Sequence, residues 1–105
     1  MKLKKALIFG ITGQDGIYLS KFLSKKKHYK IFGVTRNLNQ ISNLKKNILK
    51  DNNVTLIEIN LNHHNISSLI NKILPHEIYN LAGVSSVGYS FRYPKKTFNS
   101  IVDLN

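Results

Sequence analysis

The fold is decided by the stretch Lys5-Ala6-Leu7-Ile8-Phe9-Gly10-Ile11-Thr12-Gly13-Gln14-Asp15-Gly16. A strand-like apolar run passes here into three glycines spaced three residues apart, and an amphipathic helix follows. Glycine at these points allows a tight turn out of the strand, a close approach of backbone N–H groups to phosphate oxygens, and close packing of the helix on the sheet. The N-terminus of the helix directs N–H groups and the positive end of its dipole at an anion. We therefore predict that the turn residues Gly10, Ile11, Thr12, Gly13, Gln14, Asp15 and Gly16 bind a pyrophosphate.

The rest of the chain alternates between strand and helix periodicities. After a helix from residue 14 to about residue 27, strands are expected over residues 29–35, 54–61 and 77–82. The apolar stripes of the first three helices are Leu19, Phe22 and Leu23, then Ile41, Leu44 and Ile48, and then Ile66, Leu69, Ile70 and Ile73. Pro75 closes the third helix. A loop over residues 83–93 and a last helix starting with Phe98, Ile101 and Val102 follow.

This alternation predicts an α/β fold of Rossmann type, with a parallel sheet in the order 3-2-1-4 and flanking helices. A chain of 105 residues forms one domain at most and is small for a doubly wound sheet. It also stops inside its last amphipathic helix, without a capping glycine or a following proline. We therefore expect a truncated half of a doubly wound fold.

The composition is strongly basic, with 16 Lys and Arg against five Asp and Glu. The lysines are scattered along the chain, and this favours general solubility over a surface dedicated to nucleic acid. There is no cysteine, so disulfides and thiolate metal sites are excluded. No apolar run reaches the roughly 20 residues that span a bilayer, and the N-terminus lacks a signal-peptide core. We expect a cytoplasmic protein without a membrane or nucleic-acid partner.

The carboxyl ends of the first and fourth strands should border one crevice, because the strand order reverses between them and ligands bind at such a switch point. Twenty residues after Gly16, where an Asp or Glu would select NAD, stands Arg36. A guanidinium pairs with a ribose 2′-phosphate, so Arg36 predicts NADP. Asn60 and Leu61, at the end of the third strand, are placed to flank an adenine.

Three motifs stand out: the run Ala6 to Gly16 with Tyr18-Leu19, the segment Glu77-Ile78-Tyr79-Asn80-Leu81-Ala82-Gly83, and Ser85-Ser86-Val87-Gly88 with Ser90-Phe91. Together they resemble the GDP-mannose 4,6-dehydratase family of the extended short-chain dehydrogenase/reductase group. The resemblance extends from about Lys5 to the last residue. It implies bound NADP, GDP-mannose as the substrate, and conversion to GDP-4-dehydro-6-deoxy-mannose by a homo-oligomeric enzyme. Residues 1–105 would then be the N-terminal part of the NAD(P)-binding domain, without the catalytic and sugar-binding portion.

The resemblance also assigns roles to single positions. It implies that residues matching Gly10 to Asp15 hold the pyrophosphate and that Asn60 and Leu61 contact the adenine end. The ribose and nicotinamide side falls to Leu81, Ala82, Gly83, Val84 and Ser85. This chain departs from the common pattern at Phe9, Asn60, Val84, Ser86 and Lys96. Asn60 replaces a frequent Asp, so the adenine contact loses a charge, and Lys96 replaces a Tyr that contacts the cofactor.

No catalytic residue is assigned within the chain. The family's reaction needs a Tyr-x-x-x-Lys pair, and none of the five tyrosines has Lys four residues later. Ser85 and Ser86 have no activating His or Asp and are better hydrogen-bond donors to a ligand. The adjacent His63 and His64 point to different sides, so no metal site is predicted.

Two other interpretations stay open. A sugar-nucleotide 4-epimerase or 4-keto reductase of the same group would differ only in residues beyond Asn105. A small basic nucleic-acid-binding protein is less favoured, because aromatic residues are not interleaved with the lysines.

Overall fold

A computed structural model describes residues 3–82. Four strands form one parallel sheet in the order β3-β2-β1-β4: β1 (Lys4–Phe9), β2 (Tyr29–Thr35), β3 (Val54–Glu58) and β4 (Glu77–Asn80). The helices are α1 (Gln14–Ser24), the 3₁₀ turn η1 (Leu38–Gln40), α2 (Asn43–Asp51) and α3 (His63–Ile73). None of the helices in this part of the chain is both long and apolar enough to cross a membrane. Within these residues, the predicted strands, helices and strand order are confirmed.

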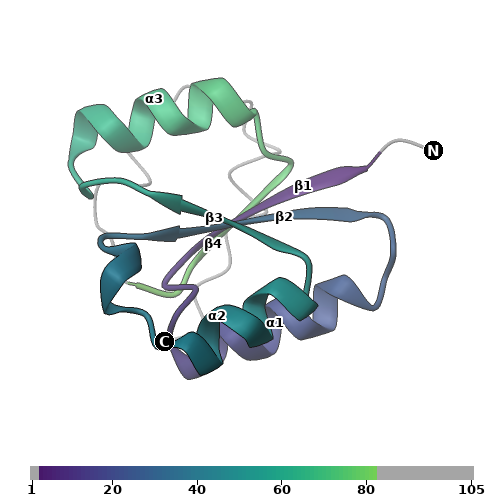
Figure 1. Ribbon diagram of the computed structural model, residues 1–105. Coiled ribbons are helices and arrows are strands. Elements are labelled where there is room, and N and C mark those ends of the chain that lie inside the picture. Colours follow the sequence, from purple (N-terminus) through teal and green to yellow (C-terminus); the bar gives the residue numbers. More distant parts are fainter. Residues whose placement is uncertain (1–2, 83–105) are drawn as a thin grey trace.

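The molecule has three layers, which Figure 1 shows from the side. Helices α1 and α2 cover one face of the sheet and α3 covers the other. The chain moves outward from β1 through β2 to β3, and α3 then carries it back across to β4 on the far side of β1. The strand order therefore reverses between β1 and β4, which creates a switch point at their carboxyl ends.

Strand β1 forms the centre of the core because it is covered on both faces. Ala6, Leu7, Ile8 and Phe9 have no exposed surface. Leu7 and Phe9 pack with the buried stripe of α3, which consists of Ile66, Leu69, Ile70 and Ile73. Ala6 and Ile8 pack on the other face with Leu23 of α1 and Leu49 of α2. The continuous apolar run is thus the pattern of a central parallel strand.

The predicted stripe of α3 is confirmed, but that of α1 is partly wrong. The buried residues of α1 are Gly16, Ser20 and Leu23, whereas Phe22 is 55% exposed. Gly16 lies against the backbone of Gly10 and Ile11, and Ser20 faces Asn52 at the end of α2, so small residues occupy these two buried positions. The helix also ends at Ser24 rather than near residue 27, and Lys27 has a positive φ of 58°.

The predicted stripe of α2 is also partly wrong, because Leu44 is 70% exposed. Ile41 is buried, but it lies before the helix in extended conformation, so it does not fix the helical phase. The helix begins only after Ser42 and buries Leu49. Leu44 lies five residues before Leu49, about 140° away around the helix.

Strands β3 and β4 end earlier than predicted, at Glu58 and Asn80. Beyond β3 the chain turns, with the N–H of Asn62 donating to the carbonyl of Asn60 at 2.9 Å. The predicted loop 83–93 and last helix lie outside the described residues.

Candidate functional site

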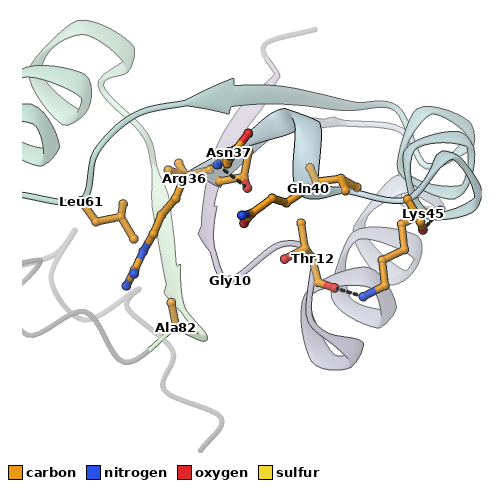
Figure 2. A pocket seen from close by; sticks show the side chains of 12 residues that line it. Gly10, Thr12, Arg36, Asn37, Gln40, Lys45, Leu61 and Ala82 are labelled. Carbon is orange, nitrogen blue, oxygen red and sulfur yellow. Dashed lines mark hydrogen bonds between the residues drawn. The ribbon is translucent and has the colours of Figure 1, made fainter.

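A pocket of about 520 Å³ lies at the carboxyl ends of β1 and β2, where the switch point was predicted. Its walls come from the glycine turn, the end of β2, the segment leading into α2, and the segments after β3 and β4. The lining residues are Gly10, Thr12, Val34, Thr35, Arg36, Asn37, Gln40, Ile41, Ser42, Lys45, Leu61 and Ala82. Figure 2 shows how they converge.

Two of the three glycines in the turn are required by the fold itself. Gly10 has a φ of +88°, and a Cβ there would lie 2.8 Å from the backbone N of Ala82. A Cβ on Gly16 would collide with the carbonyl oxygen of Gly10 and lie 2.7 Å from the Cα of Ile11. Gly10 therefore permits the turn beside β4, and Gly16 permits the close approach of α1.

Gly13 is different, because nothing in the described chain demands a glycine there. Its φ of −76° suits any residue, and the only heavy atom near a Cβ would be the Gly10 carbonyl oxygen, at 3.5 Å. A glycine at this point leaves space beside the backbone at the start of α1. The arrangement fits a pyrophosphate held against main-chain N–H groups.

The start of α1 has no side-chain cap, in contrast to the other two helices. Ser42 Oγ accepts from the N–H of Lys45 at the start of α2, and Asn62 Oδ1 accepts from the N–H of Asn65 at the start of α3. Gly13 is the N-cap of α1 and has no side chain to do this. The first turn of α1 therefore keeps N–H groups available for an external anion.

Two charged side chains line the pocket, Arg36 and Lys45, and both are cations. Arg36 follows β2 and is exposed, and in Figure 2 its guanidinium extends toward Leu61 and Ala82. Lys45 reaches from α2 to the glycine turn, where its Nζ donates to the Thr12 carbonyl at 3.0 Å. No Asp or Glu is among the lining residues of this pocket. The local charge therefore favours an anionic ligand.

The segment between β2 and α2 is held by one hydrogen bond to the neighbouring strand and one within the segment. The backbone N–H of Leu38 donates to Glu58 Oε1 at 2.7 Å, and that of Asn39 donates to Asn37 Oδ1 at 2.9 Å. Glu58 ends β3, so the neighbouring strand holds η1 in place. These bonds hold the loop that carries Arg36, Asn37 and Gln40.

The structure brings five of the predicted site residues to the pocket wall: Gly10, Thr12, Arg36, Leu61 and Ala82. Gly13, Gln14 and Asp15 are exposed at the start of α1, next to the turn. Ile11 and Gly16 are buried, so only their backbone could contact a ligand. Asn60 is exposed and does not line the pocket, and Leu81 packs on the α1–α2 side of the core. Gly83, Val84 and Ser85 lie outside the described residues.

Sequence reasoning missed seven lining residues: Val34, Thr35, Asn37, Gln40, Ile41, Ser42 and Lys45. Val34 and Thr35 end β2, and the other five belong to the segment between β2 and the first turn of α2. A signal did exist, because Ser42 is a helix-capping residue type and Lys45 stands three positions later, in the first turn. The Lys45 side chain points toward the glycine turn because of how α2 packs beside α1, and the periodicity of the sequence does not predict this packing.

The sheet order and the glycine turn at the switch point define a protein of the Rossmann class. A family model described as GDP-mannose 4,6 dehydratase matches residues 7–103. The chain therefore belongs to the GDP-mannose 4,6-dehydratase family.

Individual relatives agree with this assignment. The chain is 35% identical over 101 residues to a GDP-mannose 4,6-dehydratase from Vibrio cholerae, a match that covers 90% of this chain and 27% of the relative. It is 38% identical over 94 residues to the human GDP-mannose 4,6 dehydratase, covering 82% of this chain and 25% of the relative. The chain thus spans about a quarter of the length of the curated relatives it matches.

Solved structures support the fold. A putative epimerase from Burkholderia cenocepacia superposes with a TM-score of 0.64 at 18% identity, covering 80% of this chain and 26% of that one. A protein from Shigella flexneri described as a Rossmann-fold NAD(P)-binding family member gives a TM-score of 0.62 at 19% identity, covering 84% and 45% of the two chains.

Proposed function

We propose that residues 1–105 form the NADP-binding part of a GDP-mannose 4,6-dehydratase. In this proposal the whole enzyme converts GDP-mannose to GDP-4-dehydro-6-deoxy-mannose and water. The observation that carries the proposal is a pocket at the switch point that two cations and no carboxylate line, beside a glycine turn with open space at Gly13.

Different residues of the described chain would bind different parts of the cofactor. The turn and the uncapped start of α1 would hold the pyrophosphate through backbone N–H groups. Arg36 would pair with the 2′-phosphate of the adenosine ribose, and Leu61 would lie against the adenine. The cofactor, when bound, supplies a hydride acceptor for sugar oxidation and returns the hydride later. The part of these residues is to bind and orient it.

The groups that perform the chemistry are expected outside this chain. None of its tyrosines has Lys at the fourth following position, so the pair that would make a hydride-step base is absent from residues 1–105. We therefore expect the chain alone to show no turnover of GDP-mannose. The cytoplasmic location and the homo-oligomeric state of the whole enzyme stay predictions.

The family match favours a dehydratase over an epimerase or reductase of the same group, because the named relatives are dehydratases. It equally favours a nucleotide ligand over nucleic acid.

Calorimetric titration of the chain with NADP and with NAD tests the proposal. Arg36→Ala should lower the affinity for NADP by about one to two decades, because a charge-assisted hydrogen bond contributes roughly 1.5–3 kcal/mol. NAD lacks the 2′-phosphate, so its affinity should stay nearly unchanged. Lys72→Ala, on α3 of the opposite face, is the matched control. An NADP/NAD ratio that Arg36→Ala leaves unchanged would contradict the role of Arg36.

A further inference from the structure

Lys45 occupies an unusual position for a lysine. It lies in the first turn of α2, three residues after the N-cap Ser42, and α2 has no acidic residue in that turn. A cation at a helix N-terminus opposes the helix dipole. The helix itself therefore gives no reason for a basic side chain at this position.

The Lys45 side chain is directed into the pocket. Its Nζ donates to the carbonyl of Thr12 at 3.0 Å, and the two residues are 33 positions apart in the sequence. In Figure 2 the side chain bends from α2 down to the turn. An ammonium group has three N–H donors, and this contact uses one of them. The remaining donors lie at the edge of the pocket, next to the glycine turn.

Arg36 and Lys45 line the same pocket from different elements, and Gln40 and Thr12 are drawn between them in Figure 2. The Thr12 carbonyl is neutral, so it satisfies a hydrogen bond of Lys45 without compensating its charge. The pocket lining contains no carboxylate to do so. Two uncompensated cations facing one pocket favour a ligand with more negative charge than a diphosphate alone carries.

We propose that Lys45 is a second specificity-determining residue, which binds the ribose 2′-phosphate of the ligand together with Arg36. This inference rests on the proposed function. It assigns the phosphomonoester to the space between the end of β2 and the first turn of α2. The Arg36 side chain, which in Figure 2 extends toward Leu61 and Ala82, would turn toward this space when the ligand binds. Selectivity for NADP then comes from two cations on different elements, and the Thr12 contact keeps Lys45 directed at the site before the ligand arrives.

The test compares four nucleotides by calorimetry on the whole chain: NADP, NAD, 2′,5′-ADP and 5′-AMP. NADP and 2′,5′-ADP carry the 2′-phosphate, whereas NAD and 5′-AMP lack it. Lys45→Met should weaken NADP and 2′,5′-ADP about tenfold and leave NAD and 5′-AMP within twofold. Lys45→Arg keeps the charge and should restore most of the selectivity.

Two controls separate charge from structure. Lys45→Gln keeps a donor for the Thr12 carbonyl but no charge, so it should lose selectivity as Lys45→Met does. Lys50→Met removes an exposed lysine from the last turn of the same helix and should leave all four affinities unchanged. Melting temperatures of every variant check that the fold is intact.

Three results would overturn the inference. Equal weakening of all four nucleotides by Lys45→Met would assign Lys45 to the 5′-phosphate side. If Lys45→Met left the affinities for all four nucleotides unchanged, the only role of Lys45 would be its hydrogen bond to the Thr12 carbonyl of the turn. If the wild-type chain bound none of the four, the proposed function would fail and this inference with it, whereas binding with an unaltered NADP/NAD ratio in Lys45→Met would remove the inference alone.

Discussion

Gly13 indicates a ligand site, because no contact within the described chain requires a glycine at this position. Gly10 and Gly16 are needed for the turn and for helix packing, since a Cβ at either would meet backbone atoms. At Gly13 the backbone conformation is ordinary and a Cβ would have room. A glycine that the fold does not need points to a ligand that does need it.

This contrast predicts opposite phenotypes for two glycine substitutions. Gly13→Val should change the free energy of unfolding by about 1 kcal/mol or less, but it should abolish nucleotide binding because its side chain fills the space of the pyrophosphate. Gly10→Ala should destabilise the fold by about 1–3 kcal/mol, because its φ is positive and its Cβ would crowd Ala82. Urea denaturation and calorimetry measure the two properties. If Gly13→Val still bound the nucleotide, the turn would have a structural role only, and the proposed pyrophosphate site would be wrong.

At the scale of elements, α1 and α2 are joined by a small buried polar contact. Asn52 Nδ2 donates to Ser20 Oγ at 3.0 Å, and Ser20 Oγ donates to the carbonyl of Ile17 at 2.7 Å. Ser20 has no exposed surface and Asn52 is 8% exposed. The contact fixes the end of α2 against α1, and therefore affects where the first turn of α2 meets the pocket.

Removing one partner of this contact should destabilise the fold. Ser20→Ala leaves the buried amide of Asn52 with a weaker set of acceptors, so the free energy of unfolding should fall by about 1–3 kcal/mol. Ser24→Ala is the matched control, because Ser24 makes the same kind of bond, to the Lys21 carbonyl, at an exposed site. Its effect should stay within about 0.5 kcal/mol. A double-mutant cycle with Asn52→Ala should show coupling, and strict additivity would contradict the role of this contact.

The sequence predicted the elements and the strand order because buried parallel strands and the stripe of α3 have strong periodicity. It predicted the wrong faces for parts of α1 and α2. Phe22 is exposed because the buried face of α1 is formed by Gly16, Ser20 and Leu23. Leu44 is exposed because α2 begins only after Ser42.

The site could be predicted only as far as local sequence determines it. The glycine turn and Arg36 follow directly from strands, so their place at the switch point could be foreseen. Lys45 could not, because its contact with Thr12, which lies 33 residues earlier in the chain, depends on how α2 packs beside α1. The side chain of Ile11 packs in the core over the space that Gly33 leaves open, so only the backbone of this predicted site residue could contact a ligand.

At the scale of the whole molecule, the sheet has a polar cluster toward the amino ends of β2 and β4, at the end opposite the pocket. Tyr29 Oη donates to Glu77 Oε2 at 2.9 Å, and Tyr79 Oη donates to Glu77 Oε1 at 2.7 Å. The strand register explains the contact, because Tyr29 pairs with Lys4 and Glu77 pairs with Ala6 on the same face of β1. The small Ala6 side chain lets Tyr29 reach across β1, so the cluster ties β2 to β4.

This cluster changes the acidity of both phenols. Burial, followed by the hydrogen bond to Glu77 and its negative charge, raises the pKa of Tyr29 from 10.0 to about 12. The same causes, with burial again the largest, raise the pKa of Tyr79 further. The folded state therefore keeps both protons at pH values where the unfolded chain begins to lose them.

The pH dependence of stability follows from these shifts. A pKa that is higher in the folded state gives a contribution that is complete below pH 10 and is lost as the pH rises toward 12 and above. Urea denaturation between pH 9 and pH 12 should therefore show a free energy of unfolding that falls with pH. The double variant Tyr29→Phe/Tyr79→Phe should have a flatter profile over this range, because neither titrating phenol remains.

The control is Tyr18→Phe, which changes a tyrosine that is 76% exposed and should keep the wild-type slope. If the double variant lost stability as steeply as the wild type above pH 10, other groups would control alkaline unfolding, and the link between β2 and β4 through Glu77 would have no part in it.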